Sequence, residues 1–90
     1  MKKSYEAFAT SQVVVGATAT LISAARDGTD DVTIVNFGTT QVFIGNANVT
    51  VSNGFPIPGV VGASLTIPAT TAIYGIVASG TQPVAVLSTF

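Results

Sequence analysis

The side chains that could do chemistry are few, and three of them fall in one short acidic turn. Asp27, Asp30 and Asp31 are close together in the sequence, and carboxylate oxygens are the ligands that calcium prefers. Their spacing does not match the EF-hand calcium loop, however, and the cation Arg26 is adjacent. A solvated hairpin turn explains the same residues, because Asp27-Gly28 supplies the positive-φ position of such a turn. We therefore expect no metal ligand and no cofactor here.

Catalysis needs an activating base, and the chain offers almost none. It contains no histidine and no cysteine, which removes the usual general base, the thiol nucleophile and thiolate metal sites. Outside the acidic turn and Arg26, the ionisable side chains that remain are Lys2, Lys3 and Glu6. Nothing in the sequence brings Glu6 and the acidic turn into one cleft as a carboxylate pair. Serine and threonine hydroxyls need a base to become nucleophiles, so we expect no enzymatic activity.

The charge content of the chain is low. Charged residues make up 8% of the 90 residues, compared with about 25% in ordinary soluble domains, while 48% are hydrophobic. Three cationic residues and a net charge of −1 argue against nucleic-acid binding. A chain of this size without disulfides is marginally stable as a monomer. We infer that much of its apolar surface is buried against other subunits; a neutral soluble domain is the alternative.

Membrane insertion and export receive no support from the sequence. No run of about 18 apolar residues is present, so we expect no membrane-spanning helix. The two lysines near the start, followed by the apolar run Val13 to Ala25, have the outline of a signal peptide. Glu6 interrupts this outline, and the run alternates polar with apolar residues as strands do. We expect no signal peptide.

The elements that must position these residues are short strands separated by glycine, asparagine and proline turns. The stretch Val32 to Gly54 predicts an antiparallel meander with tight turns. Its three β-type runs are Val32 to Phe37, Gln41 to Ile44 and Asn48 to Ser52. The first has apolar groups on both faces, which indicates a central strand or one at a subunit interface. The third alternates, with Val49 and Val51 expected to point inward.

The segments before the meander predict an arm and one or two strands. Met1 to Gln12 has weak helical potential and is expected to form an N-terminal arm, followed by a β-sandwich domain over residues 13–90. Val13 to Val15 is a β-branched run stopped by Gly16, and Ala17 to Ala24 alternates. These two runs form either one long strand bent at Gly16 or a tight pair.

The second half of the chain adds further strands. Asn53 to Gly62 is excluded from a central strand by its prolines and glycines, but it is too apolar for a free loop. Strands are expected over Ser64 to Ile67, Ile73 to Ala78 and Pro83 to Ser88. Seven or eight strands at this spacing predict an all-β fold, a small antiparallel sandwich or jelly-roll-like barrel.

Two polar groups stand out within these strands. Asn36 lies within the strongly apolar run Val32 to Phe37, so we expect it to be buried and to need hydrogen-bond partners. Tyr74, with Asn46 or Asn48, could contribute to a carbohydrate-binding face, although a tyrosine in such a run is more often a core or interface residue.

Strand and turn motifs follow one another in a fixed order from Leu21 to Leu87. They fall at Val32, Ile34, Asn36 and Gly38, at Val42 to Gly45, Asn48 to Thr50 and Asn53 to Phe55, and at Ile73 to Ile76, Ser79 to Thr81 and Val84 to Leu87. This order resembles the small β-sandwich structural proteins of tailed bacteriophage virions, which include head-decoration and head-fibre proteins and modules of neck and tail proteins. The resemblance covers about three quarters of the chain and omits the N-terminal arm.

The resemblance implies a non-enzymatic virion structural protein with no catalytic residues to transfer. Its expected role is to decorate or cement a phage capsid shell as a homo-oligomer, a trimer by resemblance, made in the host cytoplasm and located on the capsid surface. Its expected partners are its own copies and the major capsid protein or other virion proteins.

Three other functions remain open. A neck, tail or fibre-base component belongs to the same class. A carbohydrate- or receptor-binding module belongs to a different class and would need exposed aromatic side chains in a groove. A pilus or surface-layer subunit would need an export signal.

Overall fold

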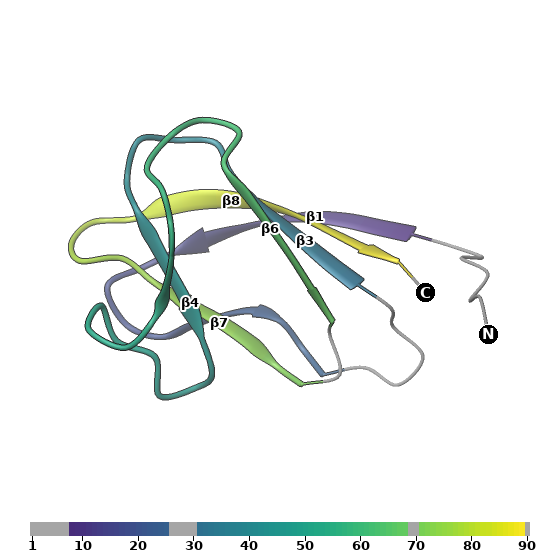
Figure 1. Ribbon diagram of the computed structural model, residues 1–90, viewed down its shortest axis with the longest axis horizontal. Coiled ribbons are helices and arrows are strands. Elements are labelled where there is room, and N and C mark those ends of the chain that lie inside the picture. Colours follow the sequence, from purple (N-terminus) through teal and green to yellow (C-terminus); the bar gives the residue numbers. More distant parts are fainter. Residues whose placement is uncertain (1–7, 26–30, 69–70, 90) are drawn as a thin grey trace.

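The computed structural model describes residues 8–25, 31–68 and 71–89, and within them the chain forms eight strands and no helix (Figure 1). Two antiparallel sheets of four strands pack as a sandwich. The strands are β1 (Phe8–Val15), β2 (Thr20–Ser23), β3 (Asp31–Asn36), β4 (Val42–Gly45), β5 (Phe55–Ile57), β6 (Ser64–Pro68), β7 (Ile73–Ile76) and β8 (Gln82–Thr89). The predicted all-β fold is confirmed.

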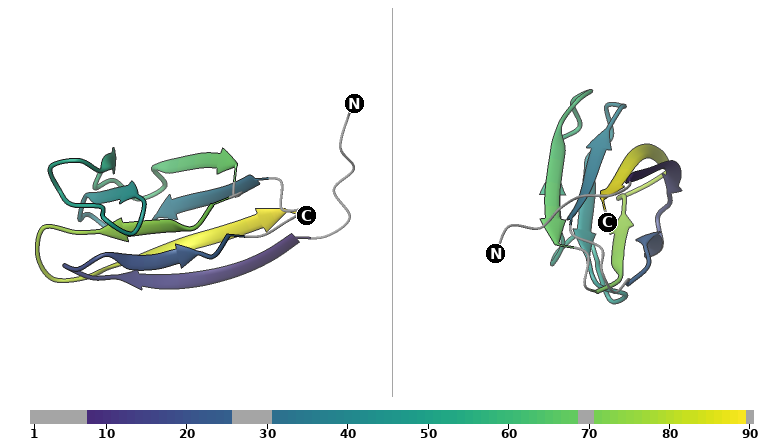
Figure 2. Two further views of the ribbon diagram at one scale, coloured as in Figure 1. Left: turned by 90° about the horizontal axis from the view of Figure 1, so that it is seen from below. Right: turned by 90° about the vertical axis from the view of Figure 1, so that its right-hand side faces the viewer.

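The strand order is that of a hairpin rolled up on itself. Each strand of the first half pairs with its counterpart in the second half, β1 with β8, β2 with β7, β3 with β6 and β4 with β5. Rolling this hairpin places β3 beside β8 and β4 beside β7. The result is sheet A, in the order β1-β8-β3-β6, and sheet B, in the order β2-β7-β4-β5. This winding is the double-sheet jelly roll, and Figure 2 shows its two layers.

Among the described residues, the buried apolar cluster between the sheets consists of valine and isoleucine, with partly buried residues such as Leu65 packed against it. Successive side chains of a strand point to opposite faces, so every second residue points into the core. For example, buried Ile34 of β3 lies opposite buried Val86 of β8. The packing is close at Gly75, where an added Cβ would come within 2.7 Å of Cδ1 of Ile22 and the isoleucine would have to shift. The buried cluster comprises Val15, Ile22, Val32, Ile34, Val42, Ile44, Ile57, Ile73, Val77, Val84 and Val86.

The predicted meander is wrong in two respects. β3 and β4 follow each other in sequence but lie in different sheets, so they do not pair. Asn48 to Ser52 is a turn and not a strand, because local hydrogen bonds replace a ladder: the Thr50 carbonyl accepts from the amide of Gly54 at 2.9 Å. Val49 is buried as expected, but Val51 is exposed. Alternation over so few residues did not distinguish a strand from a turn.

The N-terminal half also differs from its prediction. β1 begins at Phe8, so Phe8 to Gln12, assigned to the arm, pair with β8 as part of sheet A. The runs before and after Gly16 form neither one bent strand nor a tight pair, because β1 and β2 lie in different sheets. Residues 1–7 lie outside the described residues.

The Asn53 to Gly62 stretch has the expected irregular character. It contains the three-residue strand β5, whose Pro56 is tolerated because β5 is at the edge of sheet B. Ile57 is buried in the core, whereas Phe55, Val60 and Val61 are exposed. Of the large apolar side chains in this stretch, Ile57 is therefore the one that packs into the core.

Asn36 ties together the two connections that cross between the sheets. Its side chain is fully buried, as predicted. The Nδ2 group donates to the carbonyl of Thr40 at 2.8 Å, in the β3–β4 connection, and to that of Pro58 at 3.1 Å, in the β5–β6 connection. The Oδ1 atom accepts the amide of Gly38 at 2.9 Å. One side chain thus satisfies three backbone groups on both connections.

The backbone of Asn36 completes this junction. Its amide donates to the carbonyl of Ala63 at 2.8 Å, and its carbonyl accepts the amide of Gly62 at 2.7 Å. The two connections touch closely, since a Cβ on Gly59 would overlap the carbonyl of Thr39. Figure 1 shows them side by side at the top of the molecule.

We expect Asn36→Ala to lower the free energy of unfolding by about 3 kcal/mol, because it leaves buried backbone groups without partners and opens a cavity. Urea denaturation followed by circular dichroism measures this loss. The matched control is Asn46→Ala, which removes one exposed hydrogen bond, from the amide of Asn48 at 2.8 Å, and should cost about 1 kcal/mol or less. Equal losses for the two variants would contradict the role of Asn36.

Candidate interaction surface

The acidic turn is only partly within the described residues. Asp27 and Asp30 lie outside them, as does Arg26. Asp31 begins β3, and its backbone hydrogen-bonds the hydroxyl of Thr89 through both amide and carbonyl, each at 3.4 Å. Among the described residues, no group of three potential metal-ligating side chains occurs.

The candidate carbohydrate residues come to the same end of sheet B. Tyr74 is half-buried and lies opposite Gly45, the residue before Asn46. Asn46 and Asn48 are exposed, but the Oδ1 atom of Asn46 accepts the amide of Asn48 within the turn. The structure therefore brings Tyr74 near the turn that contains Asn46 and Asn48. The side-chain oxygen of Asn46 already accepts a hydrogen bond within that turn.

The outer face of sheet A is a second surface, which the sequence analysis did not single out. Strand pairing lines up its outward side chains in rows across the sheet. One row joins Thr10 of β1, Leu87 of β8 and Thr33 of β3, and Thr33 hydrogen-bonds the hydroxyl of Thr66 at 2.8 Å. The next row joins Gln12, Ala85 and Val35. Buried and exposed residues alternate along β8, and this alternation is the signal in the sequence that could have identified the face. The rows themselves depend on the register between strands, which the sequence does not show.

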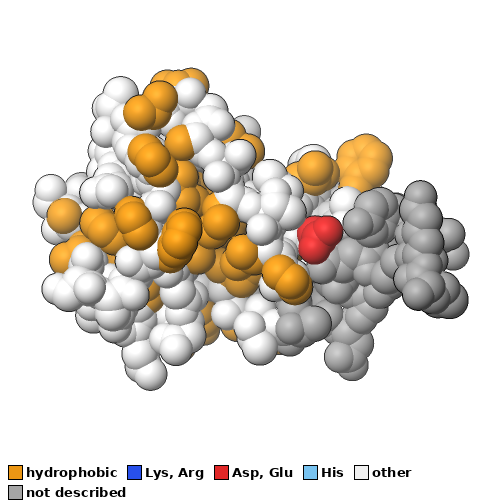
Figure 3. Space-filling view, in the orientation of Figure 1, with side chains coloured by type: hydrophobic (Ala, Val, Ile, Leu, Met, Phe, Trp, Pro, Cys, Tyr) orange, Lys and Arg blue, Asp and Glu red, His pale blue; other side chains and the backbone are white. Residues whose placement is uncertain are grey.

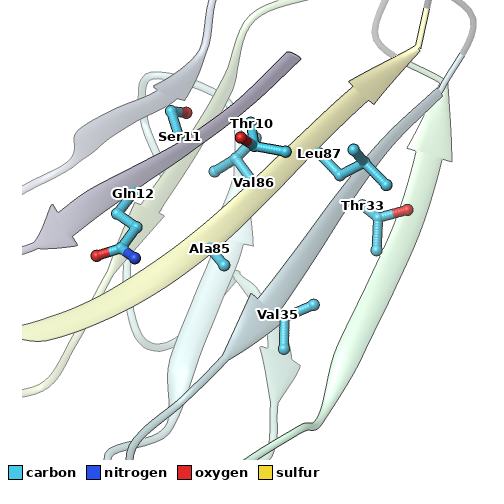
Figure 4. Close-up of a pocket in the computed structure, with 8 residues that line it drawn as sticks. All are labelled: Thr10, Ser11, Gln12, Thr33, Val35, Ala85, Val86 and Leu87. Carbon is cyan, nitrogen blue, oxygen red and sulfur yellow. The ribbon is translucent and has the colours of Figure 1, made fainter. Parts of the chain in front are cut away.

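These rows enclose a shallow hollow of about 430 Å³ (Figure 4). It exists because Ala85 is small and stands between larger neighbours on β1 and β3. Its lining residues are Thr10, Ser11, Gln12, Thr33, Val35, Ala85, Val86 and Leu87. None of these side chains is ionisable, so the hollow suits contact with a neutral surface rather than acid–base chemistry.

The phenylalanine side chains of the described residues lie outside the core. No phenylalanine is among the buried residues, while Phe8 and Phe55 are 71% and 62% exposed. Val60 and Val61, adjacent in the β5–β6 connection, are also largely exposed. Figure 3 shows hydrophobic side chains spread over the face that it displays, including the end where this connection lies. Aromatic side chains at a surface are typical of protein interfaces.

Charge is nearly absent from the same surface. Of the seven charged side chains in the chain, Asp31 is the one within the described residues. The rest of the described surface is made of hydroxyl, amide and apolar groups. Such a surface has little to keep copies of the chain apart in solution.

No protein-family model, curated protein or solved structure matches this chain. Within the described residues no helix is long and apolar enough to cross a membrane. The interpretation of function therefore depends on the sequence motifs and on the surface described above.

We expect the melting temperature to be the same with excess calcium and with a chelator, because the acidic turn is interpreted as a solvated hairpin turn. Differential scanning calorimetry on the full chain measures it. Asp30→Asn is the matched variant, and it should melt identically under both conditions. A calcium-dependent rise in the wild-type chain that Asp30→Asn abolishes would contradict this interpretation and identify a metal site.

Proposed function

We propose that this chain is a structural subunit of a tailed-bacteriophage virion that decorates or cements the capsid shell as a homo-oligomer. The observation that carries the proposal is the surface of the described residues, where large apolar side chains are exposed and Asp31 is the one charged side chain. A protein held at high local copy number in a shell can replace charge repulsion with packing. Its neutral surface then becomes an interface.

The fold is compatible with this role by analogy. Double-sheet jelly rolls occur in viral capsid proteins. They also occur in lectins, so the fold does not by itself decide the function. The strand and turn motifs that resemble virion proteins favour the first use.

The β5–β6 connection is the part of the surface that we propose for attachment to the capsid. Val60 and Val61 stand next to each other at 62% and 66% exposure. Local hydrogen bonds hold the backbone of this connection, since the Val60 amide donates to the Pro58 carbonyl at 2.8 Å and the Val60 carbonyl accepts from the Ala63 amide at 3.0 Å. A preorganised apolar tip loses little conformational entropy on docking.

The second candidate function is a carbohydrate-binding module. It is favoured by the position of Tyr74 near Asn46 on sheet B. Binding on a glycan array that Tyr74→Ala abolishes would support this candidate over the first.

Virus particles purified by density gradient from cells that carry the gene should contain this chain. We expect it to band with the major capsid protein, detected by mass spectrometry. Because few charges are available, attachment should survive about 1 M salt, where the Debye length is about 3 Å. Recovery of the chain only in the soluble fraction would contradict the proposal, and release by salt would contradict the apolar mode of attachment.

The paired substitution Val60→Ser/Val61→Ser should reduce co-sedimentation with those particles at least tenfold, because it removes the exposed apolar tip. The monomer should keep its stability, since both side chains are already exposed. Val51→Ser, in the exposed turn between β4 and β5, is the matched control and should bind like wild type. Equal binding by all three proteins would exclude this connection as the contact.

A further inference from the structure

Three of the four outer strands in the two sheets carry a feature that discourages pairing with another chain. β5 has three residues and contains Pro56, and β6 ends in Pro68. β2 has four residues, and its register with β7 shifts between Leu21 and Ser23. Short length, proline and irregular register are devices that protect sheet edges.

β1, the remaining outer strand, has none of these features. It runs for eight residues, Phe8 to Val15, in unbroken register with β8. It contains no proline, glycine or charged residue. No strand of the described residues pairs with its other side, and Figure 2 shows it along the margin of sheet A. A long, neutral and regular edge is a template for strand addition.

We propose that β1 pairs with β1 of a second copy of this chain, antiparallel and about a two-fold axis, so that two A sheets become one continuous sheet of eight strands. The partner must itself present an unprotected strand, and within the described residues β1 is the one outer strand that does. Two neutral β1 strands meet without repulsion between like charges. A two-fold contact is self-complementary and closes after two copies.

The exposed side chains of β1 select one register. Phe8 and Val14 both face outward on sheet A, opposite Thr89 and Pro83, and are 71% and 59% exposed. Placing Ser11 opposite Ser11 of the second copy sets Phe8 beside Val14 at both ends of the pairing. Cross-strand pairs of an aromatic with a β-branched residue stabilise sheets.

The same register matches the remaining residues of β1. Thr10 meets Gln12 of the other copy, so polar side chains face each other on either side of the axis. Ala9 meets Val13, an apolar pair on the opposite face. The hollow on the outer face of sheet A adjoins β1 through Thr10 and Gln12, so pairing would place two hollows beside one another.

This inference goes beyond the proposed function, because it concerns the isolated chain and does not need a capsid. In a shell, a two-fold contact of this kind would join neighbouring oligomers. A result on the purified protein therefore tests the pairing separately from attachment to particles.

Single cysteine variants test both the pairing and its register, because the chain has no cysteine of its own. In Ser11→Cys the two cysteines face each other with Cα atoms about 4.5–5.5 Å apart, within disulfide range. In Ala9→Cys the two cysteines lie four residues apart along the paired strands, so their Cα atoms are about 14 Å apart, too far for a disulfide. Under mild oxidation we expect Ser11→Cys to form covalent dimers at least tenfold faster than Ala9→Cys, as read on non-reducing gels.

Ser64→Cys on β6 is the control for random collision, since Ser64 is an exposed serine on a proline-protected edge. It should cross-link as slowly as Ala9→Cys. Adding Gln12→Lys to Ser11→Cys should slow cross-linking at least tenfold, because two lysines then flank the axis, whereas adding Ser64→Lys should not. Equal rates for Ser11→Cys and Ser64→Cys in folded protein would overturn the pairing. Faster cross-linking of Ala9→Cys than of Ser11→Cys would overturn the register.

Discussion

The jelly roll depends on the hydrogen bonds that the buried side chain of Asn36 makes to the backbone. A hairpin rolled into two sheets must cross between them in pairs of adjacent connections, and each pair leaves backbone groups that no ladder satisfies. Asn36 meets that need for the β3–β4 and β5–β6 connections, through hydrogen bonds to Thr40, Pro58 and Gly38. An apolar residue of similar size could fill the space but could not hold both connections together.

The way the core is filled determines what is left for the surface. Valine and isoleucine side chains fill the space between the two sheets. The packing is close, since a Cβ added at Gly75 would come within 2.7 Å of Cδ1 of Ile22. The described phenylalanines lie outside the core: Phe43 is half-buried within β4, and Phe8 and Phe55 are exposed at the starts of their strands. With Asp31 as the one charged side chain on the described surface, the domain presents apolar and hydroxyl groups to its neighbours. A surface of this composition is suited to assembly.

The sequence was sufficient for the fold class and for the burial of Asn36, because alternating β-branched runs and a polar residue inside an apolar run are both local patterns. It was not sufficient for the topology. The turn Asn48 to Ser52 alternates like a strand, and the register that aligns Gln12, Ala85 and Val35 depends on pairing between distant segments. The sequence predicts an arm over Met1 to Gln12 from its weak helical potential, and Phe8 to Gln12, exposed on both faces, adds no strand pattern to correct this. A strand paired on one side and exposed on both faces leaves no periodic signal.

The measurement that tests the central claim most directly is the mass of the unmodified full chain as a function of concentration, by sedimentation equilibrium. If the neutral surface and the open β1 edge serve assembly, the mass should rise with concentration from 9.0 kDa to at least twice that value, and the rise should persist in high salt. A mass that stays at 9.0 kDa up to millimolar concentration would contradict the account. The exposed phenylalanines and the unprotected edge would then need another explanation.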